Sequence, residues 1–154
     1  MWAGKSGRSI TYNRPVITNC TIAGNVKAGV SGGIPTITNS IIWGNLSPQI
    51  AEMKGLGRVT CSNVQGGWAD EGNIDTDPMF ADPVNGDYHL KSQAGRWGRQ
   101  TENWISDDVT SPCIDAGDPD SDWDAEPPAH GERINMGAYG GTSRASKSFI
   151  SDLQ

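Results

Sequence analysis

Cysteine and basic residues, which can indicate a disulfide-rich or a nucleic-acid-binding protein, are scarce in this chain. Only 3 of its 154 residues are cysteine, and 12 are Lys or Arg against 18 that are Asp or Glu. Three cysteines are too few, and odd in number, for a disulfide framework. The net charge of −6 argues against a nucleic-acid partner, because phosphate binding needs clustered basic residues.

Several functional signatures are also missing. No apolar run reaches the length of about 18 residues that crosses a membrane, so we predict no membrane span. Residues 1–8 lack the apolar core of a secretory signal, so we expect no signal peptide in this chain. No Cys-x-x-Cys pair or His at ligand spacing suggests zinc, and no Gly-x-Ser-x-Gly suggests an esterase.

The cysteines are expected to be small core residues. Cys20 and Cys61 fall in repeated strand-like segments, and a bridge between them stays open as an alternative. Cys113 lies in Ser-Pro-Cys-Ile-Asp, which we interpret as another buried strand.

The sequence does contain a repeat. Residues 15–25 read Pro-Val-Ile-Thr-Asn-Cys-Thr-Ile-Ala-Gly-Asn, and residues 35–45, 20 positions later, read Pro-Thr-Ile-Thr-Asn-Ser-Ile-Ile-Trp-Gly-Asn. A third, more degenerate copy, Val-Thr-Cys-Ser-Asn-Val-Gln-Gly-Gly, occupies residues 59–67 at an offset of 22. Periods of about 20 to 50 residues indicate stacked architectures.

The repeated unit is a strand with a tight corner. Val, Ile and Thr favour extended backbone, and the Gly-Asn or Gly-Gly endings tolerate a positive φ. Residues 26–34 are too few for the helical crossover, of about a dozen residues, that a βαβ unit requires. We therefore expect each copy to be one coil of a parallel β-helix.

Residues one repeat apart should then lie about 4.8 Å apart and form ladders. Asn19 and Asn39 are candidates for an amide–amide pair. Turn chemistry is the alternative for these asparagines, and it is at least as good an interpretation for Asn25 and Asn45. The predicted ladders are Ile17, Ile37 and Val59 on one side; Ile22, Ile42 and Val64 on another; and Thr18, Thr38 and Thr60 pointing away from the first.

These repeats, with the segments that follow them, carry a family resemblance. The chain resembles the C-terminal portion of bacterial right-handed parallel β-helix proteins, which are similar in fold to pectate lyases. The resemblance implies a secreted or cell-surface protein and little about activity, because one fold hosts many chemistries. The further segments that carry it are residues 72–80, 85–90, 111–119 and 133–142.

The resulting fold prediction is a single all-β domain over residues 1–154. Residues 1–74 should form about three coils of a short right-handed parallel β-helix, and residues 75–154 an irregular, loop-rich cap. Asn85-Gly86 should turn a hairpin between residues 77–80 and 88–90. The N-terminal coil end should be covered by residues near the start or by a second copy of the chain, or the chain is a fragment, because an uncovered strand edge promotes self-association.

Acidic residues concentrate between Ser106 and Glu126, where 8 carboxylates occur without a Lys or Arg. The alternation of acids over residues 118–124 is similar to a calcium loop, although it does not complete the EF-hand pattern. We predict a Ca²⁺ site here and keep a solvated loop of Asx-turns as the alternative. The metal-ligand candidates are Asp118, Asp120, Asp122 and Asp124.

The chain has 6 tryptophans, which is many for its length. Aromatic rings stack on the apolar faces of sugars, so exposed tryptophans beside carboxylates suit a polysaccharide. The alternative is that these rings cover the end of the coil stack, which we favour for Trp97 and Trp104. The candidates for substrate binding are Trp43, Trp68 and Trp123.

Hydrolysis of a glycosidic bond needs two carboxylates on either side of it. The catalytic candidates are Asp124, Glu126 and His130, the last as an acid–base group. We expect a carbohydrate-directed protein that binds a polysaccharide, and we leave open whether it cleaves the polymer as a hydrolase or a lyase. The alternative is a non-catalytic structural module of a bacterial surface protein.

Overall fold

The computed structural model describes residues 12–46, 48–53 and 55–149. It is all-β, with one short 3-10 turn, η1 (Pro83–Asn85). The strands are β1 (Val16–Thr18), β2 (Thr21–Ala23), β3 (Val30–Ser31), β4 (Thr36–Thr38), β5 (Ile41–Trp43), β6 (Ile50–Ala51), β7 (Arg58–Thr60), β8 (Asn63–Val64), β9 (Phe80–Asp82), β10 (Asp87–Leu90), β11 (Arg96–Gly98) and β12 (Asn103–Ile105).

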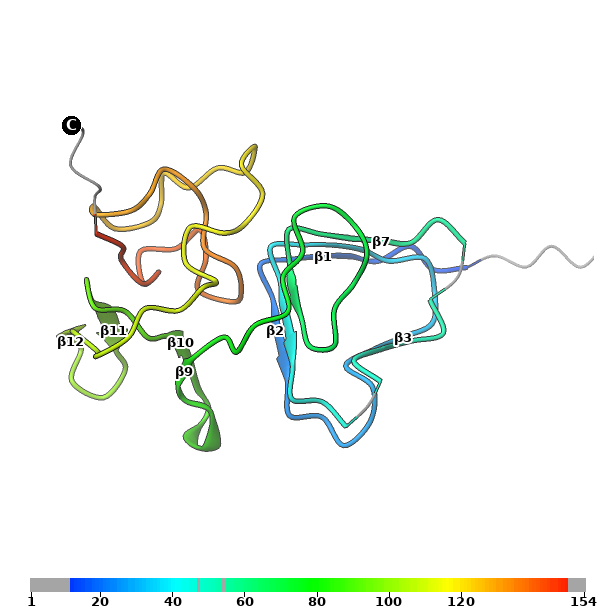
Figure 1. Cartoon of the computed structure of the whole chain (residues 1–154), viewed down its shortest axis with the longest axis horizontal. Helices are drawn as coiled ribbons and strands as arrows, with labels where there is room; N and C mark the ends of the chain where they lie inside the picture. The colour runs from blue at the N-terminus through cyan, green and yellow to red at the C-terminus, as the bar shows by residue number, and fades with distance from the viewer. Residues whose placement is uncertain (1–11, 47, 54, 150–154) are drawn as a thin grey trace, which may run out of the picture.

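The first eight strands form three small parallel sheets, which we call the stack. The sheet orders are β1-β4-β7, β2-β5-β8 and β3-β6, so each strand pairs with its equivalent one repeat later. Figure 1 shows the three passes of the chain lying over one another, with β1 and β7 along one side and β2 and β3 on the others. The repeat predicted this pairing.

The predicted ladders are confirmed residue by residue. Ile17 pairs with Ile37 and Ile37 with Val59. The ladders of Ile22, Ile42 and Val64 and of Thr18, Thr38 and Thr60 have the same parallel register. The repeat offset alone therefore fixes which residues are neighbours.

One sheet was not predicted. Val30 pairs with Ile50, and Ser31 with Ala51, where we expected only a returning connection. Val30 and Ile50 are also 20 positions apart, so the repeat period extends through this segment.

The predicted pairing of Asn19 with Asn39 is wrong. Both residues adopt left-handed backbone, with φ of 50° and 52°, and their side chains reach residues after position 117 instead. The amide contact forms at the other asparagine ladder, where Asn25 Nδ2 donates to Asn45 Oδ1 at 2.7 Å. Asn45 is buried and Asn25 is exposed.

Alternation along β5 divides the apolar residues between two cores. Ile42 points inward and packs with Ile37, Val59 and Val64 in the interior of the stack. Ile41 points outward, into a second cluster with Leu90, Cys113, Ile114 and Met136. One face of the stack is thus buried against the rest of the chain.

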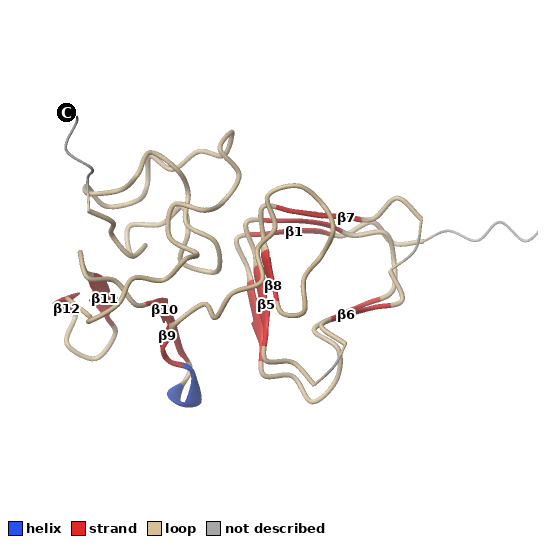
Figure 2. Ribbon diagram, viewed as in Figure 1, coloured by secondary structure: helices blue, strands red, loops and turns tan. Residues whose placement is uncertain are grey.

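Beyond residue 75, the chain forms two antiparallel hairpins and long loops, as Figure 2 shows. The hairpin of β9 and β10 turns through η1 and Gly86, which adopts left-handed backbone, so the predicted turn at Asn85-Gly86 is confirmed. In the second hairpin Trp97 and Trp104 pair across β11 and β12, with ring centroids 5.5 Å apart.

The three cysteines are free thiols. Cys61 and Cys113 are buried, as expected, and Cys20 is half-buried. The strand predicted around Cys113 is wrong, because these residues form a turn in which Cys113 N–H is bonded to Ser111 Oγ at 3.1 Å.

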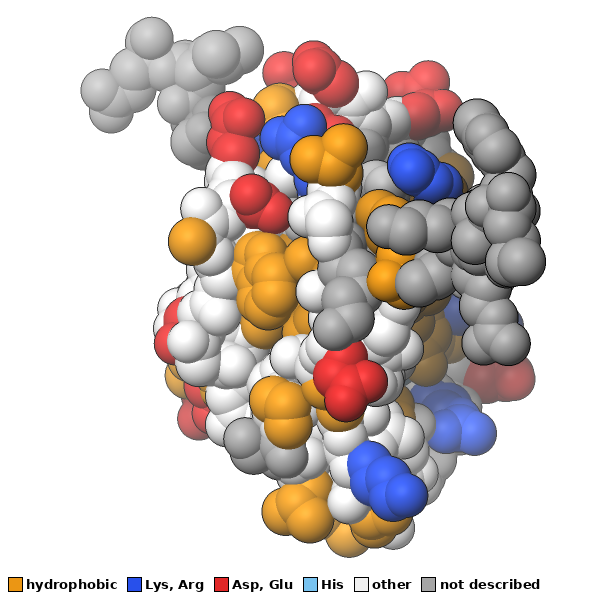
Figure 3. All heavy atoms as spheres, turned by 90° about the vertical axis from the view of Figure 1, so that its right-hand side faces the viewer, with side chains coloured by type: hydrophobic (Ala, Val, Ile, Leu, Met, Phe, Trp, Pro, Cys, Tyr) orange, Lys and Arg blue, Asp and Glu red, His pale blue; other side chains and the backbone are white. Residues whose placement is uncertain are grey.

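No helix among the described residues has the length and apolar character to cross a bilayer. On the face in Figure 3, the described Lys and Arg side chains stand apart from one another and do not merge into one basic patch.

Candidate functional site

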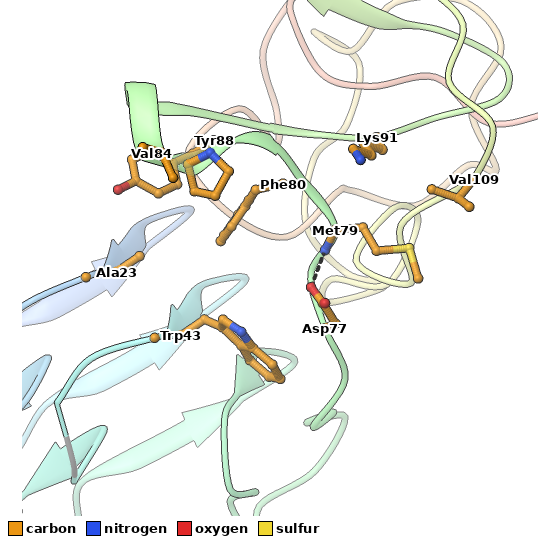
Figure 4. Close-up of a pocket in the computed structure, with 12 residues that line it drawn as sticks. Ala23, Trp43, Asp77, Met79, Phe80, Val84, Tyr88, Lys91 and Val109 are labelled. Carbon is orange, nitrogen blue, oxygen red and sulfur yellow. Dashed lines mark hydrogen bonds between the residues drawn. The ribbon is translucent and has the colours of Figure 1, made fainter.

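A groove of about 570 Å³ lies between the outer side of the stack and the β9–β10 hairpin, and we call it the hairpin groove. Figure 4 shows Trp43 and Ala23 on the stack side, with Phe80, Tyr88 and Val84 opposite them. The residues that line the groove are Ala23, Gly24, Trp43, Gly44, Asp77, Met79, Phe80, Pro83, Val84, Tyr88, Lys91 and Val109.

Strand alternation brings the aromatic residues to this groove. Trp43 lies two positions after Ile41 on β5, so it shares the outward side and packs at the edge of the outer cluster. Phe80 and Tyr88 come from the two strands of the hairpin and contact each other edge to face, with centroids 5.2 Å apart. Three aromatic rings from three strands therefore line one open space.

The groove also contains two groups of opposite charge. Asp77 Oδ1 accepts the Met79 N–H at 2.9 Å, which fixes the turn that leads into β9. Lys91 is half-buried just after β10 and takes part in none of the salt bridges of the described residues. The site thus combines apolar faces with a hydrogen-bond acceptor and a cation.

The predicted metal ligands lie elsewhere, in a loop of Asx-turns. Asp118 Oδ1 accepts the Asp120 N–H at 3.0 Å, and Asp122 Oδ1 accepts the Asp124 N–H at 2.9 Å. Among the described residues, no three His, Cys, Asp or Glu side chains gather as a metal-binding group. The turn chemistry considered as the alternative is present, and the calcium site stays a prediction.

The predicted catalytic residues are on the same loop, outside the hairpin groove. Glu126 is 6% exposed, and its Oε1 accepts N–H groups from Asn135 at 2.9 Å and Gly141 at 2.8 Å. Burial raises the pKa of the Glu126 carboxyl above its ordinary value of 4.5. Asp124 is exposed, and His130 Nδ1 accepts the Glu132 N–H at 3.1 Å. These contacts fix the loop, and the catalytic role stays a prediction.

The three predicted substrate-binding tryptophans are not brought together. Trp43 lines the hairpin groove, whereas Trp68 borders a separate hollow beside β6 and packs against the interior of the stack. Trp123 lies on the loop of residues 118–130, which we call the acidic loop, and its ring centroid is 4.4 Å from that of His130. Each therefore belongs to a different surface.

Sequence reasoning missed the other groove residues, above all Phe80, Tyr88 and Lys91. The hairpin prediction contained part of the signal, because strand alternation sets which of its side chains share a face. The sequence pattern does not show where the stack lies relative to the hairpin, and the stack forms the other side of the groove.

A protein-family model described as "Disaggregatase related" matches residues 58–117. The matched segment contains the third strand repeat, both hairpins and most of the groove lining, whereas Ala23, Gly24, Trp43 and Gly44 lie outside it. No curated protein and no solved structure matches the chain.

Proposed function

We propose that this protein binds a polysaccharide in the hairpin groove. The observation that carries the proposal is the convergence of Trp43, Phe80 and Tyr88 on one open groove. Aromatic rings offer flat apolar faces to sugar rings, and Asp77 and Lys91 offer an acceptor and donors to hydroxyl groups. The volume of about 570 Å³ is in the range of small-molecule sites, enough for one or two sugar units of a longer chain.

Binding without cleavage is the function that this groove supports best. Asp77 is the only carboxylate among the described residues that line it, whereas glycoside hydrolysis uses a pair. The protein then acts as a non-catalytic carbohydrate-binding module, at the cell surface or outside the cell, where structural polysaccharides occur. The description of the matching family is compatible with such a ligand if the polymer holds aggregates together.

We also infer that the stack is a short right-handed parallel β-helix, similar in architecture to pectate lyases. The in-register parallel pairing of three sheets over repeated segments supports this inference. Nuclear Overhauser contacts between the Ile17, Ile37 and Val59 side chains would test the stacking directly. Antiparallel contacts between these segments would contradict it.

The binding proposal is tested by affinity electrophoresis on a panel of soluble polysaccharides. Tyr88→Ala and Trp43→Leu should each weaken binding about 10-fold or more, because each removes a stacking ring. Trp123→Ala is the matched control, since that ring lies outside the groove. Unchanged binding in both groove variants, with the fold intact by circular dichroism, would reject the hairpin groove.

Cleavage is tested separately by measuring reducing ends and unsaturated products on the same panel. We expect no release. Release that is lost in Glu126→Gln or Asp124→Asn would instead support the sequence-based hypothesis of an active acidic loop.

A further inference from the structure

A second groove, of about 520 Å³, lies on the other side of the same hairpin. We call it the arginine groove, after Arg96 and Arg99. Both strands of the hairpin border both grooves: Phe80 and Tyr88 line the hairpin groove, and Ala81, Asp82 and Asp87 line the arginine groove. One hairpin therefore contributes aromatic rings to one groove and carboxylates to the other.

The two grooves meet at the hairpin tip. Pro83 and Val84 border the hairpin groove, while Asp82 and Asn85, their immediate neighbours, border the arginine groove. Val84 is 92% exposed at this tip. An extended polymer that lies over Val84 can thus contact both grooves.

Most charged groups in the arginine groove already make hydrogen bonds within the protein. Asp82 accepts bonds from Asn85 through both carboxylate oxygens, at 3.3 and 2.6 Å. Asp87 Oδ1 is 2.6 Å from His89 Nδ1. Arg96 Nε is bonded to both oxygens of Asp107, at 3.1 and 3.0 Å. These groups hold the groove in shape and retain little capacity for a ligand.

Arg99 is different. It is exposed, and Nη1 donates to the Gly86 carbonyl at 3.2 Å, which holds the guanidinium over the groove. It makes none of the salt bridges found among the described residues. A guanidinium has five N–H donors in a planar fork that matches a carboxylate or a sulfate, so most of its donors are free for a ligand anion.

We propose that the arginine groove is a second polysaccharide subsite, in which Arg99 binds an anionic substituent of a sugar two or more units away from the ring in the hairpin groove. The inference rests on the proposed function and specifies its ligand as a polymer that bears carboxylate or sulfate groups. Lys91, the cation of the hairpin groove, favours the same class of ligand.

The test compares charged and neutral forms of the same polymers. Binding of oligogalacturonate and its methyl ester, and of dextran sulfate and dextran, is measured by isothermal titration for wild type, Arg99→Gln, Arg99→Lys and Tyr88→Ala. Arg14→Gln, which removes one exposed charge on the stack, is the matched control. The two polymer pairs distinguish a carboxylate from a sulfate as the bound group.

Arg99→Gln should weaken binding of a charged form about 10-fold and leave its neutral counterpart unchanged, with Arg99→Lys in between. Tyr88→Ala should weaken both forms. If Tyr88→Ala weakens binding but Arg99→Gln behaves like Arg14→Gln, the arginine subsite is rejected while the proposed function stands. If the wild type binds none of the polymers, both are rejected.

Discussion

At the scale of single residues, Glu126 is the most constrained ionisable group of the acidic loop. Its Oε1 joins the backbone of Asn135 to that of Gly141, while Oε2 is buried without a hydrogen-bond partner. A buried carboxylate without full hydrogen bonding is costly, which is why burial raises the pKa of this group.

This raised pKa predicts a pH dependence of stability. The contribution of Glu126 is fully present below the ordinary value of 4.5 and is lost as pH rises through the raised folded-state pKa. Urea unfolding from pH 4 to 8 should therefore show that the unfolding free energy of the wild type changes less favourably with rising pH than that of Glu126→Gln. Identical pH profiles would contradict the assignment.

His89 predicts the opposite trend. It is 1% exposed and stacks on Tyr139 with centroids 3.6 Å apart, and burial lowers its pKa from 6.5 despite the contact with Asp87. Its stabilising contribution is present above pH 6.5 and is lost as pH falls through the lowered folded-state pKa. His89→Phe should thus lose less unfolding free energy than wild type on acidification.

The matched control for His89 is His130→Phe, since His130 is only partly buried on the acidic loop. An acid response of His89→Phe equal to that of the wild type would show that His89 does not drive it.

At the scale of elements, the ladders predict a gradient of stability along the stack. Ile37 is 0% exposed and lies between Ile17 and Val59, whereas Ile17 belongs to the first repeat and is half-buried. Ile37→Ala should cost about 3 to 4 kcal/mol and Ile17→Ala about half of that, because only the first leaves an enclosed cavity. Denaturant midpoints measure both, and equal costs would contradict the stacking.

The calcium ion predicted for the acidic loop can be tested by thermal unfolding. If residues 118–124 hold calcium, a chelator lowers the melting temperature of the wild type but not that of Asp120→Asn with Asp122→Asn. An unchanged wild-type melting temperature would leave a solvated loop held by its Asx-turns.

At the scale of the whole molecule, Asn39 connects the stack to the loops after residue 115. It is completely buried, its Oδ1 accepts the Asp118 N–H at 2.6 Å, and its Nδ2 donates to Ser121 Oγ at 2.9 Å. The outer apolar cluster joins the same two parts through Ile41 and Met136. We therefore predict one calorimetric unfolding transition, as for a single domain.

Asn39→Ala should lower the unfolding free energy by about 2 to 4 kcal/mol, because it removes a buried amide and both of its hydrogen bonds, to the Asp118 N–H and to Ser121 Oγ. Asn19→Ala is the control, since Asn19 has the same left-handed backbone and makes one contact, to the Gly140 carbonyl. It should cost less. Two separate transitions in the wild type would contradict the single-domain prediction.

Much of the stack was predictable because a repeat offset is local information. Once residues 20 or 22 positions apart pair in parallel, Ile37 must lie beside Ile17 and Val59, whatever the rest of the chain does. The β9–β10 hairpin was predictable for a similar reason, since Gly86 and its neighbours specify the turn. The β3–β6 sheet carried the same period in weaker form and was overlooked.

The candidate site could not be predicted in the same way, because it depends on which face of the stack meets the rest of the chain. Trp43 was selected for its residue type, and so were Trp68 and Trp123, which the fold places on other surfaces. Only packing of the second half against Ile41 brings Phe80 and Tyr88 opposite Trp43.

The sequence by itself determined the extended repeats, their register and the hairpin turn, since each follows from steric preferences and spacing over a few tens of residues. The tertiary structure decided how the hairpin lies against the stack, and with it both grooves and the free guanidinium of Arg99. The physical reason is that each groove forms between two surfaces that are far apart in sequence. No repeat or alternation in the sequence indicates that these two surfaces meet.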